Sequence, residues 1–386
     1  MIQSTPIQLV SKQPDLAMTI FAVMSQLARE QGALNLSQGF PDFQCHPHLI
    51  ELVHQHMQAG HNQYAPMQGV LALREKLAEK IEQCYGAVYD PESEITITAG
   101  ATEALYAAIT AVVHPGDEVI VFEPYYDAYV PIIEYNGGRP VFVHMQPPDY
   151  HIDWSKVRRA ITPKTRLMMF NSPHNPSGAI LNDTDIRELI DTIRNSNIIL
   201  VSDEVYEHIV FDGQEHHSFS RYPELAERSM VISSFGKTYH TTGWKIGYCA
   251  APREIMSEFR KVHQFLTYAV NTPIQMAYAD FLERRDLYEQ LSHFYQQKRD
   301  LFAGLMQQSR FTLLPCRGTY FQLADYSALS DEKDMDFAVR LTKEIKVAVI
   351  PTSVFYHERD DLHIVRFCFA KQDETLQQAA ERLCRI

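Results

Sequence analysis

Between residues 94 and 251, short apolar runs alternate with segments of helical periodicity, and this alternation restricts the possible fold more than any other feature. Seven runs rich in apolar and β-branched residues are predicted strands: Glu94–Thr98, Glu118–Phe122, Pro140–Met145, Thr165–Phe170, Ile198–Ser202, Met230–Ser233 and Ile246–Ala251. Helical patterns between several of them cover Thr102–Val113, Trp154–Ile161 and Asp183–Asn195. Strands that are apolar on both faces and alternate with helices predict an α/β fold, with a mostly parallel sheet between helices.

The remaining elements predict a second, smaller domain. Further helices are expected at Met18–Ala28, Pro47–Ala59, Val70–Tyr85, Pro273–Gln308, Asp336–Lys346 and Glu374–Ile386, and short strands at Phe311–Leu314, Thr319–Ala324, Val347–Ile350 and His363–Phe369. A chain of 386 residues exceeds what one hydrophobic core usually organises. We expect a large domain at residues 47–282, a small α+β domain at residues 283–386, and an N-terminal segment, residues 1–46, that partly joins the small domain.

Charge and cysteine usage argue against several classes of function. The formal net charge of −13 disfavours nucleic acid or an anionic membrane as a partner. The six cysteines are scattered without a C-x-x-C pair, which is typical of reduced thiols rather than of a disulfide framework. The chain has no run of roughly 18 apolar residues, and its N-terminus lacks a basic patch followed by an apolar core. We expect a cytoplasmic protein that binds small molecules, with no nucleic acid and no membrane.

A cluster of histidines near the N-terminus raises the question of a metal site. Five histidines, at positions 46, 48, 54, 56 and 61, lie close to Cys45. His54 and His56 are two residues apart, so on a helix they would not share a face. The chain also has no H-E-x-x-H motif. We predict no metal here.

In open parallel sheets, ligands bind beyond the carboxyl ends of the strands, so the residues after each predicted strand are candidates for a site. Gly100-Ala101-Thr102 opens a helix, where free backbone N–H groups and the positive end of the helix dipole suit a phosphate. Tyr126, the second of two tyrosines after the next strand, either packs in the core or stacks on a flat ring. Asp203 ends a buried strand, where a carboxylate needs a cation unless it caps a helix.

Lys237 stands just after the strand Met230–Ser233, a position at which a long charged side chain is unusual. It is either a surface lysine after a turn or a group with a chemical role. Ser234 and Gly236 suit a loop that approaches an anion, and a second lysine, Lys245, follows eight residues later. A desolvated lysine beside another cation becomes a neutral, nucleophilic amine. We therefore predict covalent chemistry at Lys237.

These features together describe one ligand. A phosphate cradle, an aromatic platform, a buried carboxylate and an amine suit pyridoxal 5′-phosphate, a planar ring with a phosphate, a basic nitrogen and an aldehyde. We expect Lys237 to hold this cofactor as a Schiff base and Asp203 to keep its ring nitrogen protonated. The ring then acts as an electron sink for a carbanion at the substrate α-carbon.

The chain also resembles a known family. Class I, fold-type I aminotransferases carry motifs similar to Asn171-Ser-Pro-His-Asn175-Pro-Ser-Gly178, Ser202-Asp-Glu-Val-Tyr206 and Ser234-Phe-Gly-Lys237 with Gly243-Trp-Lys-Ile-Gly247. The kynurenine/glutamine aminotransferase branch is similar in Leu36-Ser-Gln-Gly39-Phe-Pro-Asp42, Asn62-Gln-Tyr64 and His363-Ile-Val-Arg366-Phe-Cys-Phe369. The resemblance covers nearly the whole chain. It implies a mixed, mostly parallel seven-stranded sheet, a smaller α+β domain, and ping-pong transamination in a homodimer whose active site lies at the subunit interface.

The resemblance implies roles for the residues that meet the cofactor ring. Lys237 carries the cofactor and then shuttles a proton between the α-carbon and the cofactor, while Asp203 pairs with the ring nitrogen. Asn175 and Tyr206 hydrogen-bond the phenolic oxygen of the ring, and Tyr126 stacks on its face. Lys237, Asp203 and Tyr206 are thus the predicted catalytic residues.

The phosphate and the substrate carboxylate have their own predicted partners. Around the phosphate the resemblance places Gly100, Ala101, Thr102, Ser234 and Lys245, with Tyr64 from the neighbouring subunit. Many class I relatives have arginine where Lys245 stands, although the kynurenine/glutamine branch commonly keeps lysine. Relatives carry other residues at positions 101 and 102, so the resemblance assigns no side-chain contacts there.

Arg366 is predicted to grip the substrate α-carboxylate, with Asn175 and the backbone of Gly39 beside the substrate. A planar guanidinium suits a carboxylate better than an ammonium does. Because Arg366 lies in an apolar strand it needs a partner, which is either this carboxylate or an acid of the small domain.

The predicted substrate class follows from the absence of a second arginine among the candidate site residues. No second arginine presents itself for a side-chain carboxylate, and the candidates for the side-chain pocket are aromatic: Phe40, Tyr64, Tyr125, Phe355 and Tyr356. This predicts uncharged amino donors, methionine first and then phenylalanine, tyrosine, histidine or glutamine, with broad specificity because apolar pockets discriminate weakly.

Two other functions use the same features. A cysteine-conjugate carbon–sulfur β-lyase shares the cofactor and the abstraction of the α-proton, and its products, pyruvate and ammonia, distinguish it. A non-catalytic effector domain that senses the cofactor is the more distant alternative. It needs a DNA-binding module, for which the segment before Gly39 leaves no room.

Overall fold

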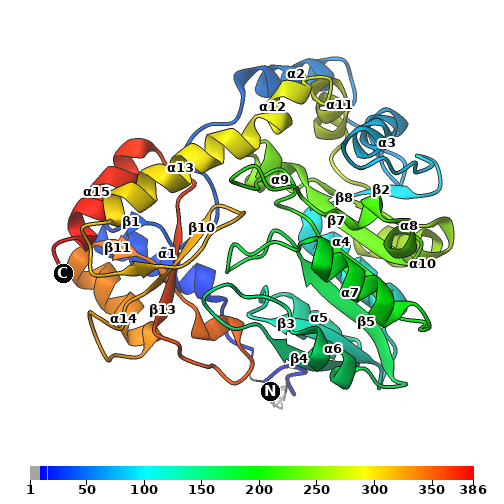
Figure 1. Cartoon of the computed structure of the whole chain (residues 1–386). Helices are drawn as coiled ribbons and strands as arrows, with labels where there is room; N and C mark the ends of the chain where they lie inside the picture. Colours follow the sequence, from blue (N-terminus) through cyan, green and yellow to red (C-terminus); the bar gives the residue numbers. More distant parts are fainter. Residues whose placement is uncertain (1–8, 15) are drawn as a thin grey trace, which may run out of the picture.

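The structure, a computed structural model, describes residues 9–14 and 16–386. It contains a seven-stranded sheet, a four-stranded sheet and a two-stranded sheet. In Figure 1 the cyan and green parts of the chain surround the large sheet, and the orange and red parts surround the four-stranded one. None of the helices in the described residues combines the length and apolar character that a membrane crossing needs.

The seven-stranded sheet positions the site. Its order across the sheet is β2 (Ile95–Thr98), β8 (Gly247–Ala250), β7 (Ser229–Ser234), β6 (Ile199–Asp203), β5 (Thr165–Asn171), β3 (Glu118–Glu123) and β4 (Arg139–His144). Only β8 runs antiparallel to its neighbours, so the other strands end at the same edge of the sheet. All seven predicted strands are present, and the prediction of a mixed, mostly parallel sheet is confirmed.

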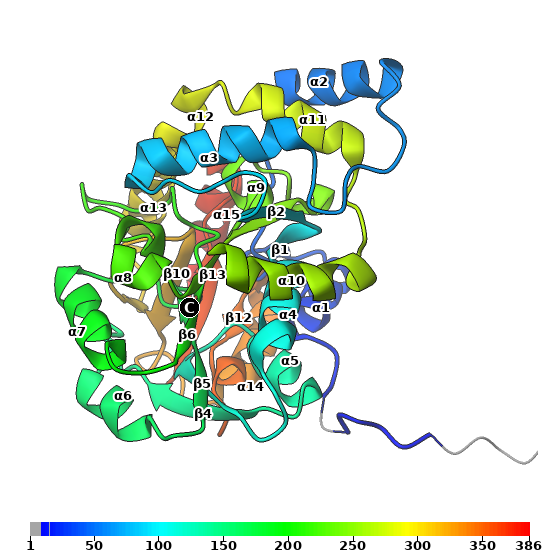
Figure 2. The ribbon, with the colours of Figure 1, turned by 90° about the vertical axis from the view of Figure 1, so that its right-hand side faces the viewer.

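Alternate residues of the strands pack against two layers of helices. Val119 and Leu167 belong to the core beneath α4 (Gly100–Val112), α5 (Tyr129–Tyr135) and α10 (Arg253–Leu266). Ile120 and Met168, one residue further along, belong to the core beneath α6 (Trp154–Ala160), α7 (Asp183–Ile193) and α8 (Pro223–Ala226). Figure 2 shows the two helix layers on opposite sides of the sheet. Because side chains alternate along a strand, two-sided burial requires the uninterrupted apolar runs of the sequence.

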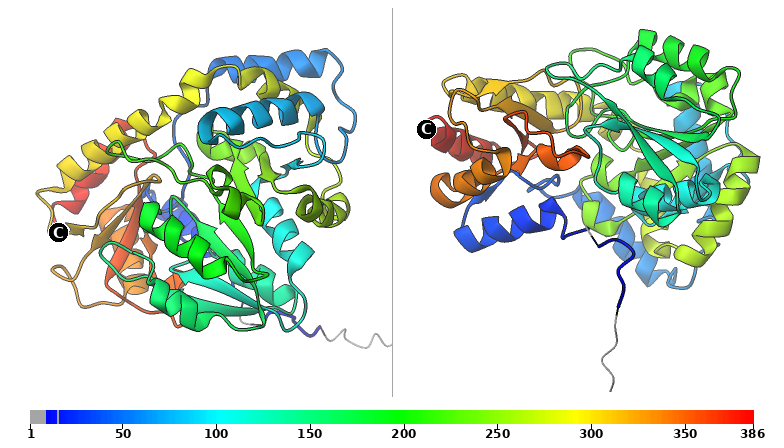
Figure 3. Two further views of the ribbon diagram at one scale, coloured as in Figure 1. Left: turned by 45° about the vertical axis from the view of Figure 1, so that its right-hand side comes forward. Right: turned by 90° about the horizontal axis from the view of Figure 1, so that it is seen from below.

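A third group of helices covers the β2–β8 side of the sheet. It comprises α2 (Pro47–Gln58), α3 (Leu71–Tyr85), α9 (Phe235–Thr238), α11 (Thr272–Phe281) and α12 (Arg285–Glu289). The helices α2, α3 and α11 lie together in Figures 2 and 3. The short helix α9 directly follows β7, so it carries Lys237 to the edge of the sheet.

The second part of the molecule joins the two ends of the chain. Its antiparallel sheet has the order β12 (Ile350–Pro351), β13 (Ile364–Cys368), β10 (Phe321–Asp325) and β9 (Thr312–Leu313). Its helices are α1 (Ile20–Gln31), α13 (Leu291–Met306), α14 (Asp334–Arg340) and α15 (Asp373–Leu383). The helix α14 continues into a π-helical turn at Leu341–Ile345. Near the N-terminus, β1 (Leu34–Asn35) pairs with β11 (Val347–Ala348). Short 3₁₀ turns lie at Phe219–Arg221, Thr242–Trp244 and Ser353–Phe355.

One prediction of local structure was wrong, one was confirmed in more detail, and one long helix was not predicted. The run 347–350 is not one strand, because β11 pairs with β1 whereas β12 pairs with β13 in another sheet. The predicted helical character of residues 273–308 is confirmed, and the segment consists of three consecutive helices. The helix α10 was missed, although its buried Met256, Phe259 and His263 give it a clear amphipathic pattern.

The division into domains at residues 47–282 and 283–386 stays a prediction. Met24 and Leu36 of the N-terminal segment do pack in the same hydrophobic cluster as the C-terminal strands.

Candidate active site

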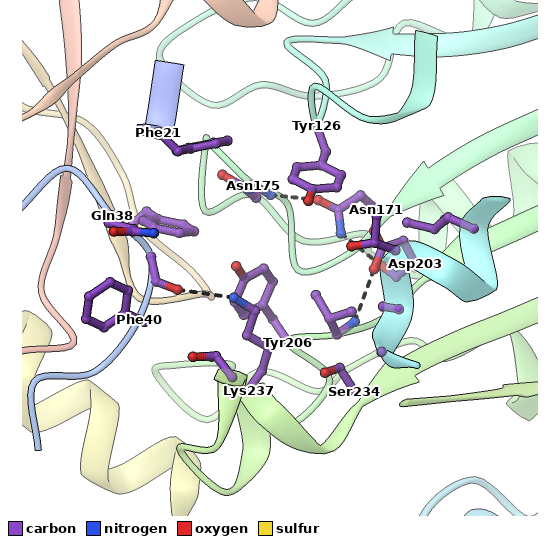
Figure 4. Close-up of a pocket in the computed structure, with 18 of the residues that line it drawn as sticks. Phe21, Gln38, Phe40, Tyr126, Asn171, Asn175, Asp203, Tyr206, Ser234 and Lys237 are labelled. Atoms are coloured by element: carbon purple, nitrogen blue, oxygen red, sulfur yellow. Dashed lines mark hydrogen bonds between the residues drawn. The ribbon is translucent and has the colours of Figure 1, made fainter. Parts of the chain in front are cut away.

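A cavity of about 380 Å³ lies at the carboxyl ends of the central strands, and residues from the seven-stranded sheet and from the four-stranded sheet line it. The predicted site residues that it gathers are Gly39, Gly100, Ala101, Thr102, Tyr126, Asn175, Asp203, Tyr206, Ser234, Lys237, Lys245 and Arg366. Figure 4 shows that Tyr206, Lys237 and Asp203 face one shared space. Tyr64 does not line the cavity of its own chain; it is 83% exposed and packs edge-on against Tyr268.

Lys237 points into the cavity from α9. Its Nζ donates hydrogen bonds to the carbonyl oxygen of Gly39, at 3.1 Å, and to the hydroxyl of Tyr320, at 3.0 Å. The Tyr320 hydroxyl in turn donates to the same carbonyl at 2.6 Å. Burial lowers the pKa of Lys237 to about 8, and the charge of Arg366 lowers it more than that of Lys245 does. Lys237 is therefore no surface lysine, and burial rather than Lys245 is the main cause of its shifted pKa.

Asp203 ends β6 on the opposite side of the cavity. Its Oδ2 accepts a hydrogen bond from Tyr129 at 2.6 Å, and its Oδ1 accepts one from the backbone N–H of Val205 at 3.4 Å. No helix begins there, so the helix-cap alternative was wrong. Burial raises the pKa of Asp203 to about 6 although the Tyr129 hydrogen bond opposes it. Within residues 9–14 and 16–386 only neutral donors hold this carboxylate, which suits it to a cationic group of a ligand.

The start of α4 forms one end of the cavity. Gly100 has a φ of +75°, and a β-carbon there would lie 3.4 Å from Cε and 3.5 Å from Nζ of Lys245. A β-carbon on Gly247 would lie 2.9 Å from the backbone nitrogen of Ala101. The two glycines thus let β8 and the Lys245 ammonium approach the free N–H groups of the helix. Ser234 lines the same cavity, and the combination suits an anion.

Arg366 lies in the middle of β13 and is fully buried. Its Nη1 donates to Oδ1 of Asn175 at 2.6 Å, its Nη2 donates to the carbonyl of Ser37 at 3.0 Å, and its Nε has no acceptor. The guanidinium stacks on the ring of Phe321, 3.9 Å from the ring centroid. Burial lowers the pKa of Arg366 to about 10, so the group stays charged at neutral pH.

The alternative of a structural ion pair was wrong for Arg366. In the described part of the chain no carboxylate lies within 4.0 Å of its nitrogens, while its side chain lines the cavity. A buried, charged guanidinium without an anionic partner is expensive for the fold unless a ligand supplies the anion. Arg366 is therefore a candidate carboxylate-binding group.

Several lining residues were not predicted. They are Phe21, Gln38, Leu105, Asn171, Val205, Thr242, Gly243 and Phe321. Asn171 stands at the end of β5 inside the turn-rich motif, a signal that was available. Phe21 and Phe321 come from segments far apart in the sequence, so no local pattern identifies them. Tyr320 and Tyr129, which hold Lys237 and Asp203, likewise carry no local signal.

The predicted aromatic side-chain pocket is only partly correct. Phe40 lines the cavity, whereas Tyr125, Phe355 and Tyr356 do not. Tyr125 instead stacks on Phe142, with ring centroids 5.8 Å apart, and its backbone N–H donates to the carbonyl of Phe355. Phe21, Phe40 and Phe321 line the cavity together with the predicted Tyr126 and Tyr206, and these five form its aromatic surface.

The histidine cluster does not form a metal-binding arrangement. His46 caps the start of α2, and His56 lies 2.8 Å from Asp280. The described residues contain no group of three or more His, Cys, Asp or Glu side chains placed to hold a metal ion.

Comparison with known proteins places this geometry in a family. Residues 31–383 match the sequence model for aminotransferase class I and II. Methionine aminotransferase of Escherichia coli (strain K12) is 51% identical over 377 residues, which cover 97% of this chain and 98% of that one. A solved structure from E. coli with a methionine aminotransferase function has a TM-score of 0.97 and 50% identity, and covers 99% of this chain and 100% of that chain.

Two further relatives are more distant but also match along nearly their whole length. The structure of N-succinyldiaminopimelate aminotransferase from Mycobacterium tuberculosis has a TM-score of 0.94 at 38% identity, covering 98% of this chain and 100% of that chain. Kynurenine–oxoglutarate transaminase of Dictyostelium discoideum is 33% identical over 408 residues, covering 95% of this chain and 94% of the relative. The predicted resemblance to the kynurenine aminotransferase branch is confirmed.

Proposed function

The chain belongs to the aminotransferase class I and II family, and from that membership we propose that it moves the amino group of methionine and other uncharged amino acids to 2-oxo acids. One observation carries the proposal: the cavity holds an amine, a carboxylate and a guanidinium, and none of the three lies within 4.0 Å of an oppositely charged side chain among the described residues. The E. coli relative is a methionine aminotransferase, which supports methionine as the first donor.

The residues fit pyridoxal 5′-phosphate as the cofactor. Asp203 has only neutral donors among the described residues, so a protonated ring nitrogen would supply the missing cation. The start of α4, with Ser234 and Lys245, would hold the phosphate, and Lys237 would take the aldehyde. When bound, the cofactor supplies an electron sink for the electron pair left at the α-carbon.

The chain's own residues then bind and move protons. Arg366 binds the α-carboxylate of the amino acid and orients the α-carbon, since its fork of N–H groups matches a carboxylate. Lys237, whose pKa is about 8, is neutral in a useful fraction of molecules near neutral pH, so its Nζ accepts the α-proton and returns it. Amino donor and oxo acid use the same groups in turn, which gives ping-pong kinetics.

The proposed assembly is a homodimer. Tyr64, Phe265 and Tyr268 are 83%, 88% and 53% exposed, and such a group of exposed aromatic residues is typical of an interface. In the dimer Tyr64 reaches the phosphate site of the partner subunit. The six cysteines are free thiols, which supports the proposed cytoplasmic location.

A panel of amino donors against several oxo acids tests the proposal. With enzyme loaded with pyridoxal 5′-phosphate, we expect kcat/KM for methionine, phenylalanine, histidine and glutamine to exceed that for aspartate by about 100-fold, roughly the effect of an unpaired buried charge. The reason is that Arg366 is the only arginine among the described lining residues. Transamination of aspartate at a higher rate than methionine would contradict the proposed substrate class.

A further inference from the structure

Gln38 is held at the cavity wall by a chain of hydrogen bonds whose direction is fixed. The backbone N–H groups of Ser37 and Gln38 donate to Oδ1 of Asn35, at 3.0 and 3.2 Å. The amide nitrogen of Asn35 therefore faces the other way, and it donates to Oγ of Ser25 at 3.5 Å. The Ser25 hydroxyl accordingly gives its own hydrogen to Oε1 of Gln38, at 2.8 Å. A turned Gln38 amide would set its N–H groups against that same hydrogen.

The fixed direction leaves the Nε2 group of Gln38 as a donor toward the cavity. Gln38 lines the cavity, and its amide nitrogen donates to none of the described residues. Figure 4 shows the nitrogen end of the Gln38 side chain turned toward the interior, between Phe21 and Phe40. Those neighbours are apolar, so the amide is the polar group of this wall.

The backbone on either side of Gln38 contacts two groups that act on the α-carbon in the proposed function. The carbonyl of the preceding Ser37 accepts from Arg366, which binds the α-carboxylate in the proposed function. The carbonyl of the following Gly39 accepts from Lys237, which moves the α-proton. Residue 38 thus lies between the group proposed to bind the α-carboxylate and the group proposed to move the α-proton, and its side chain lines the cavity that would hold the substrate side chain.

We propose that Gln38 is a specificity-determining residue whose Nε2 group donates a hydrogen bond to an acceptor atom in the substrate side chain. The inference rests on the proposed function and narrows its substrate class. Among uncharged donors of similar length, it favours the amide carbonyl of glutamine most, the weakly accepting sulfur of methionine less, and the all-carbon chain of norleucine least.

Kinetics of matched substrates and a Gln38→Leu variant test the role. We expect the kcat/KM ratio of glutamine to norleucine to fall roughly five- to tenfold in Gln38→Leu, which is the effect of one neutral hydrogen bond. Ser25→Ala, which removes the hydroxyl that orients the amide but lies outside the cavity lining, should lower the same ratio about two- to threefold. Gln26→Leu is the control, because Gln26 contacts the exposed Glu30, and it should leave the ratio unchanged.

Binding without chemistry separates this inference from the proposed function. Glutaramate and hexanoate are the side-chain analogues of glutamine and norleucine without the amino group, and both keep the carboxylate for Arg366. In calorimetric titrations of the cofactor-loaded enzyme, we expect the ratio of their dissociation constants to change roughly five- to tenfold in Gln38→Leu. An unchanged ratio overturns the role of Gln38. An unaltered enzyme that binds both carboxylates but transaminates neither amino acid contradicts the proposed function instead.

Discussion

The molecule buries cations in two regions, and the two regions treat them differently. On α3, Arg74 donates to two backbone carbonyls and pairs with Glu92, and Lys80 lies 2.8 Å from Glu207. In the cavity, Lys237 and Arg366 are buried as well, but no carboxylate of the described residues lies within 4.0 Å of either cation. A cation that supports the fold is satisfied within the chain, whereas a cation that serves a ligand is left for the ligand to satisfy.

Two adjacent residues of β7 separate these regions. Ser233 donates to Glu207 at 2.7 Å and so belongs to the paired cluster, while Ser234 lines the cavity. Successive side chains of a strand point to opposite faces, so one step along β7 leads from one environment to the other. Burial alone would raise the pKa of Glu207, but Lys80 and the hydrogen bond from Tyr85 hold it well below its usual range. In the cavity, burial prevails and lowers the pKa of Lys237 to about 8.

Loss of Lys237 gives the largest expected effect on activity. Lys237→Ala should lower kcat by about 10⁴-fold or more, because the amine both carries the cofactor and moves the α-proton. The visible absorbance of the cofactor held on the lysine should disappear as well, which absorption spectroscopy measures. The melting temperature of the unliganded variant should not fall, since Lys237 makes no ion-pair contact with a described carboxylate and its buried charge is removed. Retained turnover in this variant would contradict the mechanism.

Replacement of Arg366 should likewise weaken substrate binding without lowering the stability of the fold. Arg366→Met is expected to lower kcat/KM for methionine by about 10²- to 10³-fold, because a desolvated carboxylate loses its charged partner. The unliganded variant should melt no lower than the unaltered enzyme, since an uncompensated buried charge has been removed. Arg74→Met is the matched control on α3 and should melt lower. If Arg366→Met melted lower by as much as Arg74→Met, Arg366 would be a structural cation.

Sequence patterns predict which charged groups reach the cavity, but not whether those groups are paired. The positions of the strands and the groups at their ends follow from runs of apolar residues, so Asp203, Ser234 and Lys237 were predictable, whereas the order of the strands across the sheet was not. The partners of those groups were not, because Tyr129 and Tyr320 reach them from other elements. Whether a buried cation is paired depends on such distant contacts. For this reason sequence patterns left an ion pair open as the alternative for Arg366, and the three-dimensional contacts excluded it.

The paired cluster should respond to mutation in its stability rather than in its chemistry. Lys80→Met should destabilise the protein by about 3–5 kcal/mol, because it leaves the Glu207 carboxylate buried without its cation. Differential scanning calorimetry of the unliganded variant measures this as a lower melting temperature. The double variant Lys80→Met/Glu207→Leu should recover most of the loss, since no charge then remains unpaired. A double variant that melts as low as Lys80→Met would show that the pair itself is required.

The smallest expected effect concerns the neutral contact that holds Lys237. The amine must be unprotonated to attack the cofactor aldehyde, so capture of pyridoxal 5′-phosphate by apoenzyme should speed up about tenfold per pH unit below pH 8 and level off above it. Because the Tyr320 hydroxyl accepts a hydrogen bond from Lys237, it stabilises the charged form and opposes the lowered pKa. Tyr320→Phe should therefore move the midpoint to lower pH.

At a fixed pH below the midpoint, capture by Tyr320→Phe should be roughly two- to tenfold faster than by the unaltered apoenzyme, the range that one neutral hydrogen bond allows. Stopped-flow absorbance across a pH series measures both the rate and the midpoint. Tyr295→Phe is the matched control, since the Tyr295 hydroxyl is buried without a hydrogen-bond partner among the described residues and its ring lies 5.5 Å from that of Tyr320. A midpoint that shifts equally in both variants would assign the effect to packing. A shift confined to Tyr320→Phe would show that the hydrogen bond from Lys237 to Tyr320, the residue just before β10, raises the pKa of this cavity lysine.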